Sequence, residues 1–149
     1  MLRSLKILAL VVSTCLALAS SPARSQTRVL DLEVDDASRE LGGTSSRRWV
    51  VDGVSIYLSE GGRCTKGHVF RFSAKKMVKI DRCEDGSMIS EQQPWALRSG
   101  DPDLILRIGS VDYRARFRQD GAKRQLLLRK AARIKAVENE DILLTLSRD

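Results

Sequence analysis

Apolar and polar residues alternate with a period of two along most of the chain after residue 48. Five runs show this alternation: Val54, Ile56 and Leu58; Phe70 and Phe72; Val78 and Ile80; Trp95 and Leu97; and Leu104, Leu106 and Ile108. Successive side chains of a β-strand point to opposite faces, so each run predicts a short strand with one buried face. Because turn residues separate the runs, the pattern predicts an antiparallel, all-β domain.

The dipeptide Asp120-Gly121 is the strongest turn signal in the chain, because it separates the alternating runs VDYRARFRQ and AKRQLLLRK. A two-residue Asp-Gly connection is typical of a type I′ β-hairpin. Centring a hairpin on it sets Tyr113 opposite Leu128 on an apolar face and Arg116 opposite Gln125 on a polar face. A shift of one residue would exchange the two faces, so this clean sorting supports the register.

Residues 26–48 are predicted to form an N-terminal strand and a polar connector. In the segment RVLDLEV, Leu30, Leu32 and Val34 alternate with acidic residues, as in a half-buried strand. The following segment, DDASRELGGTSSRR, is polar and contains two glycines, which is typical of a loop. The barrel domain is then expected to span residues 49–149.

The C-terminal third is compatible with two structures. The segment KRQLLLRKAARIKAVENED has no glycine or proline and is rich in helix formers, so a basic amphipathic helix is one possibility. The hairpin register predicts a strand for its first half, and ILLTL reads as a closing strand. We favour hairpins, and the choice between strand and helix for residues 129–139 stays open. The alternative fold is α+β with a C-terminal helix.

The first 25 residues have the three-part layout of a secretory signal peptide. Basic MLRSLK precedes the uncharged run ILALVVSTCLALA and the small-residue tail SSPARS. The apolar run is shorter than the roughly 20 residues that a membrane-spanning helix needs. We therefore predict export, with cleavage after Ser25 or after Ala19. A retained anchor, or a lipid on Cys15 in the lipoprotein-like sequence VSTC, is the alternative.

Removal of this leader changes the charge and leaves one domain. The net charge of +7 would fall to +4, because three basic residues and no acidic residue are lost. The remaining chain, about 124 residues long, is enough for one core but not for two. It contains no second long apolar segment, so we expect no transmembrane segment in the mature protein.

Cys64 and Cys83 are the cysteines that remain after leader removal. An even number of cysteines in an exported chain predicts a disulfide, and closing this loop should stabilise the fold by about 3 kcal/mol. We expect the bond at the open end of a hairpin that sets Phe70 opposite Val78 and contains a bulge at Gly67. The predicted location is the periplasm or the extracellular space.

Several segments between Trp49 and Leu146 follow an order found in a known class of small barrels. They are the early tryptophan in RRWVVDGVSIYL, the two cysteines, PWALRSGDPDLILRI, and the arms YRARF and LLLRK. This order resembles small exported bacterial lipocalin-like domains, which implies an up-and-down β-barrel that binds a small ligand. Arg47 stands where lipocalins have a glycine two residues before the tryptophan. Periplasmic protease inhibitors built as one-disulfide barrels are similar to the same degree.

Catalytic and metal-binding patterns are weak in this sequence. A serine or cysteine nucleophile needs a neighbouring base, and His68 is the sole histidine. Its strand parity with Phe70 and Phe72 favours a structural role. We predict no enzyme activity, no catalytic residue and no metal or other cofactor.

Two groups of residues are candidates for binding. Aromatic side chains at strand spacing could line a ligand cavity: Trp49, Phe70, Phe72, Trp95 and Tyr113. Basic side chains on the Asp-Gly hairpin could form a face for an anionic partner, such as an envelope surface: Arg114, Arg116, Arg118 and Lys123. No exposed aromatic residues are interleaved with this face, so we do not expect nucleic-acid binding.

The sequence favours an exported, non-enzymatic β-barrel that binds a small apolar or anionic ligand or an envelope component. The alternative is a protein-binding inhibitor of a protease or other hydrolase in the same compartment. For the inhibitor, the segments SEGGRC and EDGSMISEQQPW are the candidate contacts. The identity of the ligand or partner and the oligomeric state are not predicted.

Overall fold

The computed structural model describes residues 26–54, 56, 58, 59, 61–65, 67–131 and 141–146. The predicted leader, with Cys15 and both cleavage positions, lies outside the described residues. Most of the segment 129–139 lies outside them as well, but its first two residues belong to a strand. No helix of the described residues is long and apolar enough to cross a bilayer.

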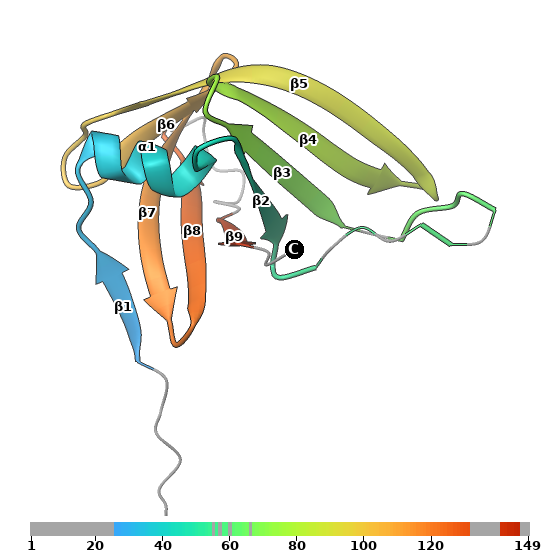
Figure 1. The fold of residues 1–149 in the computed structure, drawn as a ribbon, viewed down its shortest axis with the longest axis horizontal. Coiled ribbons are helices and arrows are strands. Elements are labelled where there is room, and N and C mark those ends of the chain that lie inside the picture. The colour runs from blue at the N-terminus through green and yellow to red at the C-terminus, as the bar shows by residue number, and fades with distance from the viewer. Residues whose placement is uncertain are drawn as a thin grey trace, which may run out of the picture.

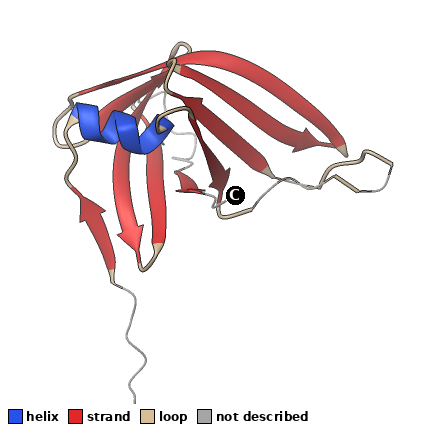
Figure 2. Ribbon diagram, viewed as in Figure 1, coloured by secondary structure: helices blue, strands red, loops and turns tan. Residues whose placement is uncertain are grey.

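Nine strands and one helix make up the described chain, and Figures 1 and 2 show the helix lying against a curved sheet. The elements are β1 (Thr27–Leu30), α1 (Val34–Gly42), β2 (Ser46–Val51), β3 (His68–Ser73), β4 (Met77–Glu84), β5 (Ser87–Arg98), β6 (Leu104–Ile108), β7 (Val111–Asp120), β8 (Lys123–Lys130) and β9 (Ile142–Leu146).

Eight of the strands close into an antiparallel barrel. Each strand from β2 to β8 pairs with the next one in the chain, and β9 returns to pair with β2. The ninth strand, β1, pairs with β7 beyond the end of β6. The all-β, up-and-down barrel that the alternating pattern predicts is thus confirmed, together with the single disulfide.

The barrel interior is filled by the apolar residues that the alternation places inward. Trp49, Phe72 and Leu126 are fully buried, and Phe117 is nearly so. Rings meet edge to face, with centroids 6.3 Å apart for Trp49 and Phe117 and 5.8 Å apart for Phe72 and Trp95. Such edge-to-face pairs add to the stabilisation that burial of the rings provides.

Helix α1 closes one end of the barrel, and its presence corrects the predicted strand and connector. The strand ends at Leu30, and residues 34–42 are helical instead of irregular. Ala37 and Leu41, four residues apart, are fully buried, so this segment has a helical period that the acidic residues obscured. The helix ends at Gly43, whose φ of 63° suits glycine and whose N–H bonds the carbonyl of Arg39.

The predicted strand through Val54, Ile56 and Leu58 is also wrong. The chain makes only isolated bridges here, between Val51 and Val54 and between Leu58 and Cys64. Asp52 and Gly53 both have positive φ, so the chain turns away directly after β2. Strand β2 pairs with β3, and the described residues between them form a loop outside the barrel (Figure 1).

Both predicted hairpin registers are shifted by two residues, which leaves the faces unchanged. Tyr113 lies opposite Lys130, and Arg116 lies opposite Leu127. The turn residues are Gly121 and Ala122 instead of Asp120 and Gly121, and the positive φ of Gly121 is the one that a type II′ turn requires. In the β3–β4 hairpin, Phe70 lies opposite Ile80, where Val78 was expected.

Candidate functional site

The five aromatic candidates for ligand binding come together inside the barrel. Trp49, Phe70, Phe72 and Trp95 are buried in one core cluster, and Tyr113 packs against that cluster half-buried. Burial raises the pKa of the Tyr113 hydroxyl, so this side chain is neutral. Phe72 stacks on Phe70 and meets Trp95 edge to face, and the cluster to which the five side chains belong fills the barrel as a core does.

The basic face predicted on β7 and β8 is interleaved with carboxylates. Arg116 donates from Nε to Oδ1 of Asp103 at 2.7 Å. Lys123 lies opposite Asp120 in the register. Hydrogen bonds from Arg129 lower the pKa of Asp141 most, and the charge of Arg118 adds to this effect. Arg114 is exposed. This face therefore carries alternating charges instead of a continuous basic patch.

The disulfide between Cys64 and Cys83 has a Cα–Cα distance of 5.9 Å and lies at the open end of the β3–β4 hairpin, as predicted. Cys83 lies near the end of β4, and Cys64 precedes β3 in the loop outside the barrel. The predicted bulge at Gly67 is wrong, because the N–H of Cys83 donates to the carbonyl of Gly67 at 3.1 Å and continues the register of the hairpin. The bond fastens an external loop to the barrel wall.

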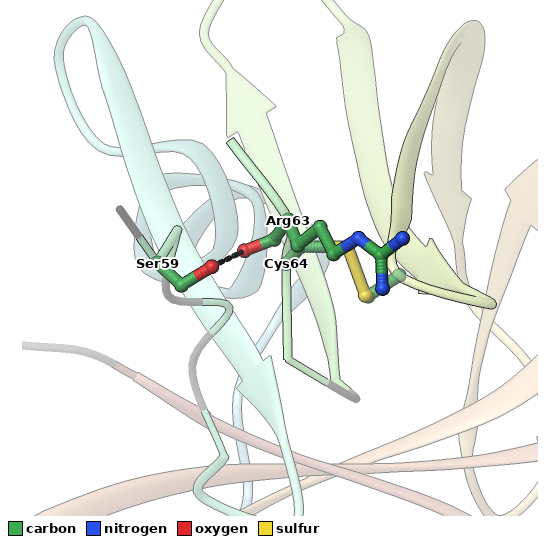
Figure 3. The surroundings of a disulfide bond; sticks show 4 residues. Ser59, Arg63 and Cys64 are labelled. Carbon is green, nitrogen blue, oxygen red and sulfur yellow. Dashed lines mark hydrogen bonds between the residues drawn. A yellow bond between two sulfur atoms is a disulfide. The ribbon is translucent and has the colours of Figure 1, made fainter. Parts of the chain in front are cut away.

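The disulfide brings together the two segments that the inhibitor hypothesis selected. In the loop, the N–H and Oγ of Ser59 donate to the carbonyl of Arg63 at 2.7 and 2.9 Å, which makes a tight turn (Figure 3). The N–H of Cys64 donates to the carbonyl of Gly86, in the β4–β5 turn, at 3.0 Å. We call residues 58, 59, 61–65 and 84–89 the braced end.

Apolar side chains are exposed at and beside the braced end. The exposed fractions are 48% for Val54, 59% for Leu58, 47% for Met88 and 37% for Ile89. Val29 and Val111 are the other large apolar residues of the described chain that are exposed. Exposed apolar side chains that gather in one place are typical of an interaction surface.

A hollow of about 300 Å³ lies on the outer barrel wall beside the braced end. We call it the outer hollow, and its lining residues are Arg48, Ile56, Leu58, Val69, Arg71, Lys79, Asp81 and Met88. Its basic members lie directly opposite one another on three adjacent strands, Arg48 with Arg71 and Arg71 with Lys79. We call these three residues the cationic row.

Asp81 is the buried acid of the outer hollow, with an exposed fraction of 4%. Arg71 bonds it, Lys79 Nζ lies 3.4 Å from Oδ1, and Ser90 Oγ donates to Oδ1 at 2.6 Å. Burial works to raise the pKa of Asp81, but the Ser90 hydrogen bond and the charges of Lys79 and Arg71 outweigh it and lower the pKa. Asp81 is therefore ionised at neutral pH.

A larger groove, of about 810 Å³, lies at the end of the barrel that is opposite to the braced end. It runs between the β1–α1 segment and the β5–β6 loop. Asp31, Glu33 and Asp35 line it together with apolar residues of both segments. Acidic residues at the start of a helix also complement the helix dipole, so these carboxylates have a structural role.

His68 lies exposed at the start of β3, opposite Arg82. Within the part of the chain that the structure describes, no three His, Cys, Asp or Glu side chains form a group that could hold a metal ion.

Comparison with family models, curated proteins and solved structures finds no match to this chain. The functional argument below therefore depends on the geometry of the barrel and its loops.

Proposed function

We propose that this protein is an exported, non-enzymatic binding module that docks onto a hydrolase of its own compartment through the braced end. The observation that carries the proposal is the position of Cys64. Its disulfide and its hydrogen bond to Gly86 hold two tight turns side by side. A disulfide persists in the periplasm and outside the cell, which fits export.

The shape of the braced end favours a concave partner. The β4–β5 hairpin extends beyond β6, and the loop tied to it projects from the same side of the barrel (Figure 1). Projecting turns offer a convex surface, and the substrate clefts of hydrolases are concave. A hydrolase cleft therefore has the shape complementarity that stable docking on this end requires.

Contacts within the chain hold the described residues of the braced end in place before a partner binds. The loop is fixed at one side by β2 and at the other by the disulfide to β4. The Arg63 side chain lies along the disulfide and passes beside Gly86 (Figure 3). A loop that is fixed in advance loses little conformational entropy on binding, and this favours affinity.

The exposed apolar side chains supply anchors for docking. Leu58 and Met88 border the same hollow, one from the loop and one from β5. Burying such side chains in a partner removes apolar surface from water, and a few anchors of this kind dominate the affinity of most interfaces.

A lipocalin-like internal site, the other function that the sequence suggests, has weaker support. Its candidate lining residues pack against one another, and Trp49 and Phe72 are fully buried. Room for a small ligand in the barrel would require these side chains to move apart, which close packing opposes.

The test is a panel of purified secreted and periplasmic proteases and lysozymes, assayed with increasing amounts of the protein. We expect at least one enzyme to be inhibited. The double variant Leu58→Asp/Met88→Asp should weaken that inhibition by about tenfold or more, the loss expected for hot-spot side chains.

The matched control is the double variant Val29→Asp/Val111→Asp, which places the same two charges on exposed apolar residues of β1 and β7, away from the braced end. It should leave the inhibition unchanged. Absence of inhibition across the panel, or equal losses in the two variants, would refute docking through the braced end.

A further inference from the structure

We propose that one edge of strand β5 is a self-association surface, to which a second copy of this chain adds its own β5 in antiparallel orientation. The inference goes beyond the proposed function, because it concerns the assembly of the protein with itself and needs no hydrolase. It rests on the backbone groups along this edge, on the length of the edge, and on the side chains that a second copy would bring to it.

Strand β5 is covered on both sides over only part of its length. Strand β4 pairs with its residues 87–94, and β6 pairs with Trp95–Arg98. Among the described strands, none pairs with residues 87–93 on the side away from β4, and we call this side of residues 87–93 the free edge. Figure 1 shows this part of β5 as the outer strand of the projecting hairpin. An unpaired edge is a template on which another strand can add.

Two hydrogen bonds show which backbone groups point to the free edge. The N–H of Trp95 donates to the carbonyl of Lys76, just before β4, at 2.9 Å. The carbonyl of Pro94 accepts instead from Gly109, just after β6, at 2.9 Å. Backbone groups of successive strand residues point to alternate sides, so the even-numbered residues of β5 point away from β4. The free edge therefore offers the N–H groups and carbonyls of Met88, Ser90 and Gln92.

The free edge lacks the usual protection against strand addition. Natural edge strands often carry prolines, lysines or bulges that prevent pairing with another chain. Residues 87–93 contain no proline or lysine, and their register with β4 is continuous. Their one charged residue, Glu91, lies 3.5 Å from Arg82 of β4. Met88 and Ile89 are 47% and 37% exposed, so apolar side chains also remain for a partner to cover.

A second copy has an edge of the same length, and a two-fold axis at Ser90 makes the two edges antiparallel. Met88 of each copy then lies opposite Gln92 of the other, and Ser90 lies opposite Ser90. Each of these pairs exchanges two backbone hydrogen bonds, so every backbone group of both free edges is used. Ser87 of the second copy lies opposite Gln93, directly before the point where β6 begins to cover β5.

A shift of this register by two residues in one direction is blocked. It would place Ser87 of the second copy at Trp95, where Ile108 of β6 already lies. It would also set the two Glu91 carboxylates opposite each other, and like charges in direct opposition destabilise a sheet. In the centred register Glu91 faces Ile89 of the second copy, so no like charges are opposed across the edge.

A shift in the other direction loses hydrogen bonds. It would place Gly86 of the second copy at Gln92, but the carbonyl of Gly86 already accepts from the N–H of Cys64 at 3.0 Å. The disulfide to Cys83 holds Cys64 in this place. The bond to Cys64 thus limits the edge at one end, and β6 limits it at the other. The centred register is the one that uses the whole edge.

The test follows self-association by analytical ultracentrifugation, and amide hydrogen exchange by NMR, over a series of protein concentrations. We expect a monomer–dimer equilibrium, in which the amides of Met88, Ser90 and Gln92 exchange more slowly as the concentration rises. The amides of Ile89 and Glu91 point to β4 and should change less. Absence of a dimer up to about 1 mM would overturn the proposal. Slow exchange of the edge amides at every concentration would overturn it as well, because the edge would then be covered within one copy.

Two substitutions of Gln92 isolate the contribution of the backbone. Gln92→Pro removes an N–H that points to the free edge, and this removal costs no hydrogen bond to β4. Gln92→Ala shortens the same side chain but keeps the N–H. We expect Gln92→Pro to weaken the dimer by about tenfold or more and Gln92→Ala by less than about threefold. Equal effects of the two substitutions would contradict pairing through the backbone. Circular dichroism checks that both variants keep the barrel.

Two substitutions of Ile89 test the partner and the register without proline. Ile89→Lys places a positive charge opposite Glu91 of the second copy and should tighten the dimer by about threefold to tenfold, whereas Ile89→Glu should weaken it. Within one copy the effects on stability should have the opposite sign, because residue 89 lies opposite Arg82 of β4. Urea unfolding of the dilute monomer measures these effects. A weaker dimer with Ile89→Lys would overturn the proposed register. None of these assays contains a hydrolase, so their outcome is independent of the inhibition assay.

Discussion

Asp81 is the one buried charged residue among those that the structure describes. It lies opposite Val69 on β3 and Ser90 on β5, in the row of residues next to the cationic row. A buried carboxylate is tolerated when hydrogen bonds and opposite charges replace its hydration. Ser90, Lys79 and Arg71 provide this replacement. Asp81 thus compensates the charges of Arg71 and Lys79, which lie opposite each other on two adjacent strands.

The Asp81→Asn substitution should destabilise the fold at neutral pH by about 1–3 kcal/mol, because it removes the carboxylate that Arg71 and Lys79 share. The folded pKa of Asp81 lies below its ordinary value of 3.8. Its ionisation therefore stabilises the fold above that pH, and the contribution is lost as the pH falls through the lower folded pKa. Urea unfolding at pH 7 and at pH 2–3 should show a difference between the variants that shrinks in acid.

Asp112→Asn is the matched control for this substitution. Asp112 accepts hydrogen bonds from Arg107, which lower its pKa, but the pair lies on the exposed surface. Surface ion pairs contribute little to stability. A loss as large as that of Asp81→Asn, or a difference at Asp81 that grows in acid, would contradict the assigned role.

At the residue scale, the sequence allows the inward side chains to be predicted but not the outer hollow. The inward orientation of Phe70, Phe72 and Phe117 follows from alternation alone. A register error of two residues does not change it. The opposition of Arg48, Arg71 and Lys79 depends on the registers of two strand pairs, and no local signal specifies them. The sequence shows basic residues at positions 48, 71 and 79, but it does not indicate that they lie opposite one another on β2, β3 and β4.

Hydrogen bonds from two residues of strand β2 hold helix α1 against the barrel. The indole N–H of Trp49 donates to the carbonyl of Leu41 at 3.0 Å. Arg47 donates to the carbonyl of Glu40 at 3.0 Å and pairs with the Glu40 carboxylate at 3.2 Å. These bonds hold the helix on the barrel.

Leu41→Ala should destabilise the protein by about 2–4 kcal/mol, since the leucine is fully buried and its truncation leaves a cavity beside Trp49. Urea unfolding measures the loss, and a red shift of tryptophan fluorescence should report water near the indole. Thr44→Ala, at an exposed position just after the helix, is the control. A loss below about 1 kcal/mol would show that the helix does not close the barrel tightly.

At the element scale, local patterns failed where tertiary contacts decide the structure. The alternation at residues 54–58 is that of a strand, but the turn at Asp52 and Gly53 removes this segment from the wall. The apolar face of the helix at residues 34–42 consists of few residues, which are separated by acidic ones. The helical period can therefore be recognised only once Ala37 and Leu41 are known to be buried.

At the scale of the whole molecule, sequential hairpins predict a meander, but closure requires the pairing of β9 with β2. These strands are far apart in the sequence. The segment ILLTL predicts a closing strand, but no residue pattern identifies β2 as its partner. The disulfide does not take part in this closure. It lies on the outside of the wall and joins the loop to β4.

The double variant Cys64→Ser/Cys83→Ser should therefore lose stability without losing the barrel. We expect a loss of about 2–4 kcal/mol, because the bond restricts the unfolded chain over a separation of 19 residues. The far-UV circular dichroism should be unchanged, since every barrel strand keeps its neighbours. Limited proteolysis should cut the variant first in the loop near Arg63, where the remaining contacts are a few hydrogen bonds. Cleavage that begins in the barrel strands instead would mean that the disulfide supports the wall itself, and the braced end would then not be a separable element.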